Sequence, residues 1–342
     1  MSTGGGVASV LRRAARRSGG SGATGTTGDA MAPRWRGQPG RLEVWYATLS
    51  DPASGIGCWI HHELAAPVAG GPSTYGWIAL FRPDAPPVLE RFGPVPVPAA
   101  RPAGEYPSPE GTLFAPPRLA GSAGRVAWDL RWADPPGDGT HAPLFTFPAW
   151  AWEREVLPGA QVVPVPAAAF SGTLTLDGAA RALSDGARGG VAHIYSHGSA
   201  QRWGWLHADL GDGDVLEVVS ATSRAPGLGH LPPLAFVQLR LGGHDWPRDP
   251  ALAAPLFRTQ LGLPHWQVRG TVGRWRLRAE VTIPADAAVV LTYTDPDGST
   301  ATCTNSEVAD AHIVLEHRQE RWAVERTWTL SARAHAEIGT RP

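Results

Sequence analysis

Lysine is absent from this sequence, and all 30 of its basic residues are Arg. The chain therefore has no lysine for a Schiff base or for a phosphate-binding P-loop. Cysteine is scarce as well, because only Cys58 and Cys303 occur. Two cysteines are too few for a thiolate zinc site or a disulfide-stapled secreted fold, so we predict a protein of the reducing cytoplasm.

Long apolar runs and an excess of charge are also missing. No stretch of about 18 apolar residues occurs, so no integral membrane segment is expected. The formal net charge is −1, from 30 basic and 31 acidic residues, which provides no field to attract nucleic acid. No Gly-rich phosphate loop opens a helix and no nucleophile elbow is present, so we expect no cofactor. The sequence does not indicate the oligomeric state.

Glycine and proline are abundant instead, at 41 and 33 residues, and both disfavour long helices. The dominant periodicity is two, as in 125–132 and 274–283, where apolar and charged residues alternate on opposite faces of a strand. Many short strands at close spacing are typical of a β-barrel or sandwich. The remaining predicted strands are 41–49, 56–64, 75–82, 171–176, 191–197, 203–210, 214–221, 234–241, 287–294, 300–305, 311–317 and 322–330.

Four other segments lack this alternation. The Pro-rich stretches 83–118 and 158–167 predict surface loops, because Pro cannot donate to a central ladder. A short connecting helix is predicted over 249–262. Residues 1–38 predict a disordered tail, which contains Arg and Gly but no apolar stretch of the kind a secretory signal requires. Translation could begin at Met1 or at Met31, and the sequence leaves both open.

The densest group of chemically active residues lies between positions 193 and 209. If 191–197 and 203–210 are both extended, each presents its polar and aromatic residues on one face. We predict that the two faces meet on one pocket wall, with ligand-binding residues His193, Tyr195, His197, Trp203 and Trp205. The alternative is that the indoles fill the core and the imidazoles are hydrogen-bonded at a barrel rim.

The same wall offers candidate proton donors. A carboxyl group among indoles has its charged form disfavoured, so its pKa rises and it can deliver a proton near neutral pH. Asp209 is the first candidate catalytic residue and Glu217 the second, while His207 could orient either carboxyl or donate itself. Trp faces can stabilise a developing carbocation by cation–π attraction of roughly 0.5 to 2 kcal/mol per ring.

A second, weaker group lies in the first half of the chain. Trp45, Trp59 and His61 combine indole, imidazole and nearby carboxylates on successive predicted strands, and we predict that they also bind the ligand. A metal site is not expected, because His193 and His197 would have backbones about 13 Å apart along one strand. An ordinary, solvated strand face remains the alternative for this group.

Three passages of the sequence are similar to one known family. They are the opening hairpin, 43–52 with 57–62; the central passages 171–178, 190–198 and 202–209, with a Trp-x-Trp strand; and the closing hairpin, 293–309. These resemble the family that contains tocopherol cyclase and carotenoid hydratase (hydroxyneurosporene synthase), which are lipocalin-like proteins. The family's usual Asn-Trp-Gly reads Ser196-His197-Gly198 here.

The resemblance implies an all-β fold of two tandem lipocalin-like antiparallel β-barrels, over 39–180 and 181–342, with few short helices. It also implies a hydrophobic, often isoprenoid, ligand, and members that protonate or close an alkene without a cofactor. We therefore predict a Trp-rich pocket that binds a hydrophobic small molecule. Three functions stay open: a hydratase or cyclase of the lyase or isomerase class, a carrier without turnover, or a carbohydrate-binding β-sandwich with Trp rings on an open face.

Overall fold

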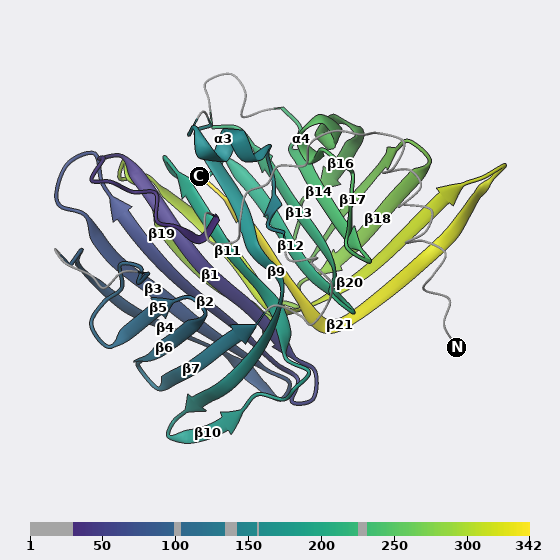
Figure 1. Cartoon of the computed structure of the whole chain (residues 1–342). Coiled ribbons are helices and arrows are strands. Elements are labelled where there is room, and N and C mark those ends of the chain that lie inside the picture. Colours follow the sequence, from purple (N-terminus) through teal and green to yellow (C-terminus); the bar gives the residue numbers. More distant parts are fainter. Residues whose placement is uncertain (1–29, 99–103, 134–141, 156, 225–230) are drawn as a thin grey trace.

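The computed structural model describes residues 30–98, 104–133, 142–155, 157–224 and 231–342. Two antiparallel sheets lie side by side, and each curls into a half-barrel (Figure 1). The half-barrel of the first sheet is called the first unit, and that of the second sheet the second unit. The predicted all-β, two-barrel, lipocalin-like fold is confirmed. Among the described residues, no helix is both long and apolar enough to cross a membrane.

The first sheet has the strand order β4-β3-β2-β1-β11-β9-β7-β6-β5, with β8 and β10 also paired to β9. Its strands are β1 (Arg41–Asp51), β2 (Ile56–Ala66), β3 (Ser73–Arg82), β4 (Ala85–Pro96), β5 (Thr112–Ala115), β6 (Arg118–Ala123), β7 (Val126–Ala133), β8 (Leu144–Phe145), β9 (Gly159–Leu176), β10 (Ala179–Ala182) and β11 (Arg188–Ser196).

The second sheet has the order β15-β14-β13-β12-β21-β20-β18-β17-β16, with β19 paired to β20. Its strands are β12 (Arg202–Gly211), β13 (Asp214–Thr222), β14 (Leu234–Leu241), β15 (His244–Trp246), β16 (Phe257–Gln260), β17 (His265–Val272), β18 (Trp275–Thr282), β19 (Val289–Thr294), β20 (Thr300–Arg318) and β21 (Trp322–Thr340). The short helices are α3 (Ala149–Glu153) and α4 (Pro250–Ala253), with 3-10 turns η1 (Ala254–Leu256) and η2 (Ala285–Ala287).

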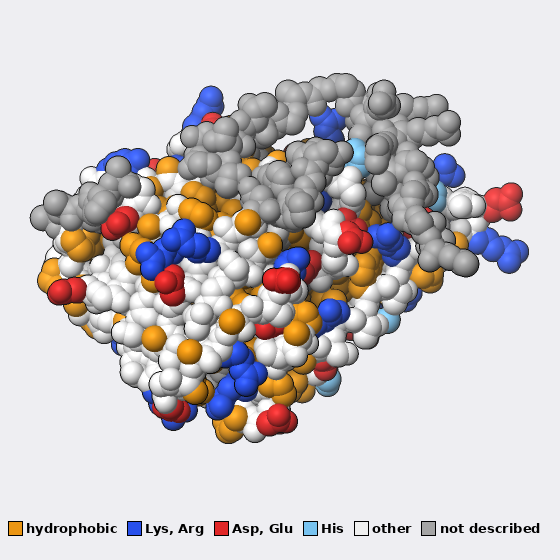
Figure 2. All heavy atoms as spheres, turned by 60° about the horizontal axis from the view of Figure 1, so that its bottom comes forward, with side chains coloured by type: hydrophobic (Ala, Val, Ile, Leu, Met, Phe, Trp, Pro, Cys, Tyr) orange, Lys and Arg blue, Asp and Glu red, His pale blue; other side chains and the backbone are white. Residues whose placement is uncertain are grey.

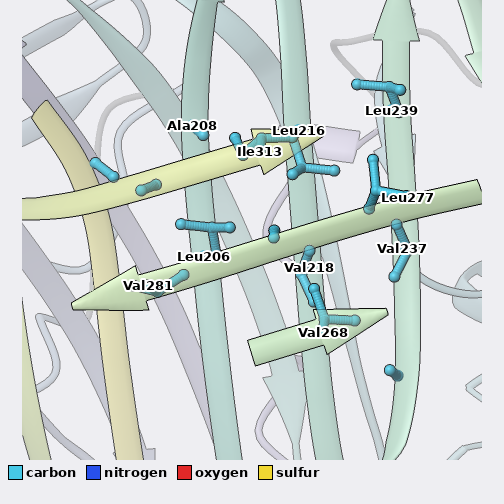
Figure 3. Close-up of a cluster of buried hydrophobic side chains, with 14 of the residues drawn as sticks. Leu206, Ala208, Leu216, Val218, Val237, Leu239, Val268, Leu277, Val281 and Ile313 are labelled. Carbon is cyan, nitrogen blue, oxygen red and sulfur yellow. The ribbon is translucent and has the colours of Figure 1, made fainter. Parts of the chain in front are cut away.

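Alternation along the strands fills the interior of each half-barrel with apolar side chains. In the second unit, side chains from six strands converge on one cluster (Figure 3): Leu206, Ala208, Leu216, Val218, Val237, Leu239, Val268, Leu277, Val281 and Ile313. On the outside, Figure 2 shows a face where arginines and acidic residues are interspersed, as expected for a net charge of −1. The side chains on the opposite face of each of these strands point away from this core and can make other contacts.

The change from the first sheet to the second comes later than the predicted boundary at residue 180. Strand β11 pairs with β1 on one side and β9 on the other, so it completes the first sheet. The chain crosses to the second sheet between Ser196 and Arg202. Alternation shows which residues of a strand share a face, but it does not show which sheet the strand joins.

Three predicted loop or helix segments also differ from the structure. The stretch 83–118 contains β4, and β4 is an edge strand, where Pro leaves no central ladder bond unmade. The stretch 158–167 belongs to β9, whose pairing with β11 shifts register there. The predicted helix over 249–262 is only α4 and η1, after which the chain continues as β16.

Part of the predicted tail is ordered. Residues 1–29 lie outside the described residues, but Ala30 and Met31 are buried on the first unit. The Tyr106 hydroxyl donates to the Met31 carbonyl, and the carboxylate of Glu43 accepts hydrogen bonds from the Arg34 amide at 2.6 Å. Buried polar groups on the first sheet therefore hold the chain from Ala30 onward, contrary to the prediction of disorder to residue 38.

One buried histidine of the first unit makes the fold sensitive to acid. His62 on β2 is fully buried, with Nδ1 2.9 Å from Ser108 Oγ and its ring against Phe92. Burial, and then the neighbouring His61, lower the pKa of His62 to about 3. The unfolded chain, where a histidine has its ordinary pKa of about 6.5, therefore takes up the proton first as pH falls.

We expect this histidine to reduce the free energy of unfolding progressively below about pH 6.5, by about 2 to 3 kcal/mol between pH 7 and pH 4.5. Urea unfolding of the wild type and of His62→Gln at both pH values measures it, and the acid-induced loss should be smaller by that amount in the variant. His265→Gln, at an exposed position on β17, is the matched control and should lose as much as the wild type. Equal losses in all three proteins would contradict the prediction.

Candidate functional site

The polar face of β12 lies where the two sheets pack together. Leu206 and Ala208 point into the core of the second unit, so Trp205 and His207 point the other way, onto the first sheet. There the Trp205 ring meets Tyr46 of β1 edge-on, with centroids 4.8 Å apart. The first sheet thus covers a face that would otherwise be exposed to solvent.

His207 is held by a carboxylate on the next strand. The register of β12 and β13 places Glu217 opposite His207, and His207 Nδ1 is 2.5 Å from Glu217 Oε1. The other oxygen of Glu217 accepts from Trp205 Nε1 at 2.8 Å, which fixes the carboxylate. Burial lowers the pKa of His207, but the charge and hydrogen bond of Glu217 outweigh burial and raise it above the ordinary value.

A second histidine and carboxyl pair stands beside the first. A bulge in β20 makes Glu307 and Val308 both oppose His335 of β21, and His335 Nδ1 is 2.5 Å from Glu307 Oε1. Burial, and then the charge of Glu337, raise the pKa of Glu307 well above its ordinary value. Burial, and then His207, lower the pKa of His335 well below its ordinary value. Burial therefore disfavours the charged form of both members of this pair.

His207, His335 and Glu307 line one pocket between the sheets, with a cavity volume of about 70 Å³. Three buried polar atoms of its lining have no hydrogen-bond partner among the described residues: Thr48 Oγ1, His207 Nε2 and His335 Nε2. Buried polar atoms are normally paired, by protein, water or ligand. The cavity has room for about five water molecules, or for the reacting end of a larger molecule.

Two glycines of the first sheet allow this close packing. A Cβ on Gly190 of β11 would lie 2.8 Å from Cε1 of His207. A Cβ on Gly57 of β2 would lie 2.6 Å from Cβ of Glu307. The absence of a side chain at these two positions lets the first sheet approach both pairs directly. Within the described ranges, no three His, Cys, Asp or Glu side chains are grouped to hold a metal ion.

The sequence profile of the tocopherol cyclase-like family matches residues 140–340, which includes both pairs. The chain belongs to this tocopherol cyclase-like family. An uncharacterized protein of Mycobacterium tuberculosis (strain H37Rv) is 52% identical over 324 residues, covering 94% of this chain and 93% of that protein. The family resemblance inferred from the three sequence passages is thereby confirmed.

Two crystal structures share the fold of this tocopherol cyclase-like chain. CghA with Sch210972 has a TM-score of 0.56 at 13% identity, covering 88% of each chain. The protein named AttH from Nitrosomonas europaea has a TM-score of 0.54 at 14% identity, covering 88% of this chain and 92% of its own. At such identities the likeness concerns the fold.

Of the predicted site residues, His207, Glu217 and Trp205 come together in this family member. Asp209 lines the pocket as well, but it is only half-buried, and its Oδ1 accepts from the Gly211 amide in a hairpin turn. The carboxyl group beside an indole is Glu217 rather than Asp209. Trp203 lies further along the same face, where Nε1 donates to Glu337.

The residues of β11 are not part of this wall, because β11 belongs to the first sheet. His193 is fully buried inside the first unit, with Nε2 2.9 Å from Glu43 Oε1. Tyr195 packs in a separate small cluster with Trp152, and His197 is exposed. The structure does not bring residues 193–197 and 203–209 onto one wall.

The predicted residues of the first half divide between two places. Trp45 is fully buried in the first unit's core and stacks on Tyr106, with centroids 4.3 Å apart. Trp59 and His61 lie on the face that meets the second sheet, and His61 Nε2 is 2.9 Å from Glu63 Oε2. Sequence reasoning missed the second pair, His335 and Glu307, and Thr48 at the pocket.

Proposed function

We propose that this chain catalyses an acid–base reaction, the hydration, cyclisation or isomerisation of an alkene, in the pocket between its sheets. One observation carries the proposal. His207 and His335 both line the cavity, and neither Nε2 has a hydrogen-bond partner among the described residues. Against the effect of burial, Glu217 raises the pKa of His207, whereas burial and then His207 lower the pKa of His335, whose Nε2 lies 4.0 Å from Glu337 Oε2. Two imidazoles in one pocket, of which one favours its charged form and the other its neutral form, are a matched proton donor and acceptor. Membership of the tocopherol cyclase-like family supports the same reaction class.

His207 is the proton donor in this proposal. Its Nε2–H bond breaks as the alkene π pair takes the proton and forms a new C–H bond, which leaves a neutral imidazole and an electron-deficient carbon. Glu217 holds the ring and stabilises the charged form before transfer. Trp205 and Tyr46 are not among the residues that line the cavity, but the Trp205 ring contacts the His335 ring, with centroids 3.9 Å apart, and so helps to position it.

His335 is the proton acceptor. When Nδ1–H of His335 donates to Glu307, Nε2 presents a lone pair to the cavity. The oxygen of water, or of a hydroxyl group in the substrate, bonds to the electron-deficient carbon, and its proton passes to Nε2 of His335. One proton has then moved from His207 to His335, and it returns through solvent at the pocket mouth.

The acid strength of His207 narrows the substrate class. The raised pKa of His207 makes its imidazolium a weaker acid than an ordinary one, too weak to protonate an isolated alkene quickly. We therefore propose an alkene that is electron-rich or conjugated with a carbonyl group, on a hydrophobic and possibly isoprenoid-derived skeleton. The cavity encloses only the reacting group, so the rest of such a molecule would extend through the mouth.

Deuterium incorporation tests the proposal. Purified protein is incubated in D₂O with a panel of prenylated phenols and quinols, isoprenoid alcohols and enones, and products are analysed by mass spectrometry. We expect one deuterium at the new C–H bond of at least one substrate, and loss of the reaction in His335→Asn. His265→Asn, far from the pocket and exposed, is the matched control and should react like the wild type.

The same experiment separates an enzyme from a carrier. A carrier would retain a panel compound, recovered by extraction and mass spectrometry, with no deuterium and no change of mass in any arm. That result would overturn the proposed function in favour of carriage. A carbohydrate-binding face is disfavoured, because Trp205 is buried against Tyr46 rather than displayed on an open surface.

A further inference from the structure

The mouth of the pocket carries two arginines, one from each sheet. Arg188 begins β11 and Arg333 lies on β21, and both line the cavity together with Asp209. Arg188 Nη1 donates to the carbonyls of Asp185 at 2.7 Å and Ala187 at 2.9 Å, which orients the guanidinium. Its Nε and Nη2, and the whole guanidinium of Arg333, have no hydrogen bond or ion pair with the described residues.

A second bulge directs Arg333 to this place. Ala309 pairs with Ala334 and Ala311 pairs with Leu330, so the three residues 331–333 of β21 oppose a single residue of β20. Ala332, in the middle, has a φ of 51°, in the left-handed region that costs a non-glycine residue about 1 kcal/mol or more. Bulges of this kind commonly re-aim a side chain beside a functional site.

That strained conformation is held by a specific contact. The carboxylate of Asp310, the residue opposite the bulge, accepts a hydrogen bond from the Ala332 amide at 2.8 Å. The backbone on either side returns at once to regular pairing, with Leu330 and Ala334 both buried in the core. The bulge therefore displaces Arg333 and its two neighbours alone, and it places a cation at the rim of the pocket.

The charges around the cavity do not balance. His207 is paired with Glu217 and His335 with Glu307, so each imidazole of the lining has its own carboxyl partner. At the rim, two guanidinium groups stand against the single carboxylate of Asp209. Guanidinium groups thus outnumber carboxylates at the rim, and most of the arginine donors have no partner among the described residues.

We propose that Arg188 and Arg333 bind an anionic group of the substrate, a carboxylate or a phosphate, at the pocket mouth. The inference rests on the proposed function, because it assigns a substrate class to the same pocket. Arginine suits this task, since its planar fork of donors matches two oxygens of a carboxylate or phosphate. With the acidic group at the rim, the alkene of the same molecule reaches inward to the two histidines.

Matched ligands test the substrate class without requiring turnover. Geraniol, geranic acid and geranyl phosphate share one skeleton and differ in charge, and cinnamyl alcohol with cinnamic acid forms a second pair. Calorimetry should show the anionic members binding about tenfold more tightly than the alcohols. The geranic acid and geranyl phosphate arms show which anion is preferred.

Variants assign the preference to the two arginines. Arg333→Gln and Arg188→Gln should each weaken binding of the anions about threefold to tenfold and leave the alcohols unchanged, while Arg333→Lys retains part of the preference. Arg181→Gln, on the exposed strand β10, is the matched control and should bind like the wild type. Equal affinity for acids and alcohols, a preference that survives in the double variant, or no binding of any anion would overturn the inference.

Failure of the anion site at the rim can be distinguished from failure of the proposed acid–base reaction. His335→Asn should keep the preference for anions, because it removes the proton acceptor and leaves the rim intact. Deuterium transfer to neutral substrates without a preference for anions would refute the rim site and leave the acid–base reaction standing. Preferential binding of anions with no proton transfer to any substrate would support the rim site and refute the acid–base reaction.

Discussion

Replacing His207 by Gln should lower turnover by about 10² to 10⁴-fold, the range that a positioned general acid contributes. Gln keeps a polar side chain of similar reach but cannot deliver a proton. The variant should still fold, because Glu217 would retain its hydrogen bond from Trp205. Single-turnover rates on the substrate found in D₂O measure the effect, and circular dichroism checks the fold.

The pH dependence of the rate distinguishes a proton donor from a merely structural residue. His207 acts in its charged form, so the rate should fall as pH rises through its raised pKa. Glu217→Gln removes the charge that raises this pKa, so the fall should move to lower pH in that variant. A rate in His207→Gln within about threefold of His265→Gln, or a pH profile that Glu217→Gln leaves in place, would remove His207 as the acid.

Replacing Gly57 by Ala should lower the free energy of unfolding by about 3 kcal/mol. The new methyl group would lie 2.6 Å from Cβ of Glu307, 3.0 Å from its carbonyl oxygen and 3.1 Å from a methyl of Val308. None of these atoms is the free end of a flexible side chain, so the sheets must separate or the β20 bulge must shift. Chemical denaturation measures the loss.

The matched control is Gly71→Ala, where the added methyl group meets nothing within 4 Å. We expect that change to alter stability by less than about 1 kcal/mol, because it only restricts the unfolded chain. Turnover should also fall in Gly57→Ala, because Glu307 is the hydrogen-bond partner of His335 and would be displaced. Similar stability in the two variants would show that the sheets do not pack as closely here as described.

The predictable part of the fold follows from local alternation. The two-residue period of 203–210 predicted that Trp203, Trp205 and His207 share one face of a strand, and in the structure Leu206 and Ala208 pack in the core on the other face. Alternation carries no information about partners, however. His193 and His207 are both on strands with a polar face, but β11 and β12 belong to different sheets.

The missed half of the site lies where the strand pattern is broken or weak. Glu307 sits at a bulge, which interrupts the period of two in β20. Arg333, His335 and Glu337 do alternate with Ala334 and Ala336, but alanine is a weak apolar signal, and the predicted strand ended at residue 330. This alternation of alanines with polar residues was the signal that could have extended the predicted strand beyond residue 330.

All four members of the two histidine and carboxyl pairs come from the second half of the chain, while the first half contributes the cover. A fragment beginning after Ser196 would therefore keep both pairs but lose Arg188 and the cover, and we expect it to be inert. If bulk water covered the two imidazoles, burial would no longer separate their pKa values. The difference that makes one a proton donor and the other a proton acceptor would then disappear. The amino-terminal half thus acts on the chemistry through exclusion of solvent, which ties the two halves together in any working ancestor or redesign of this protein.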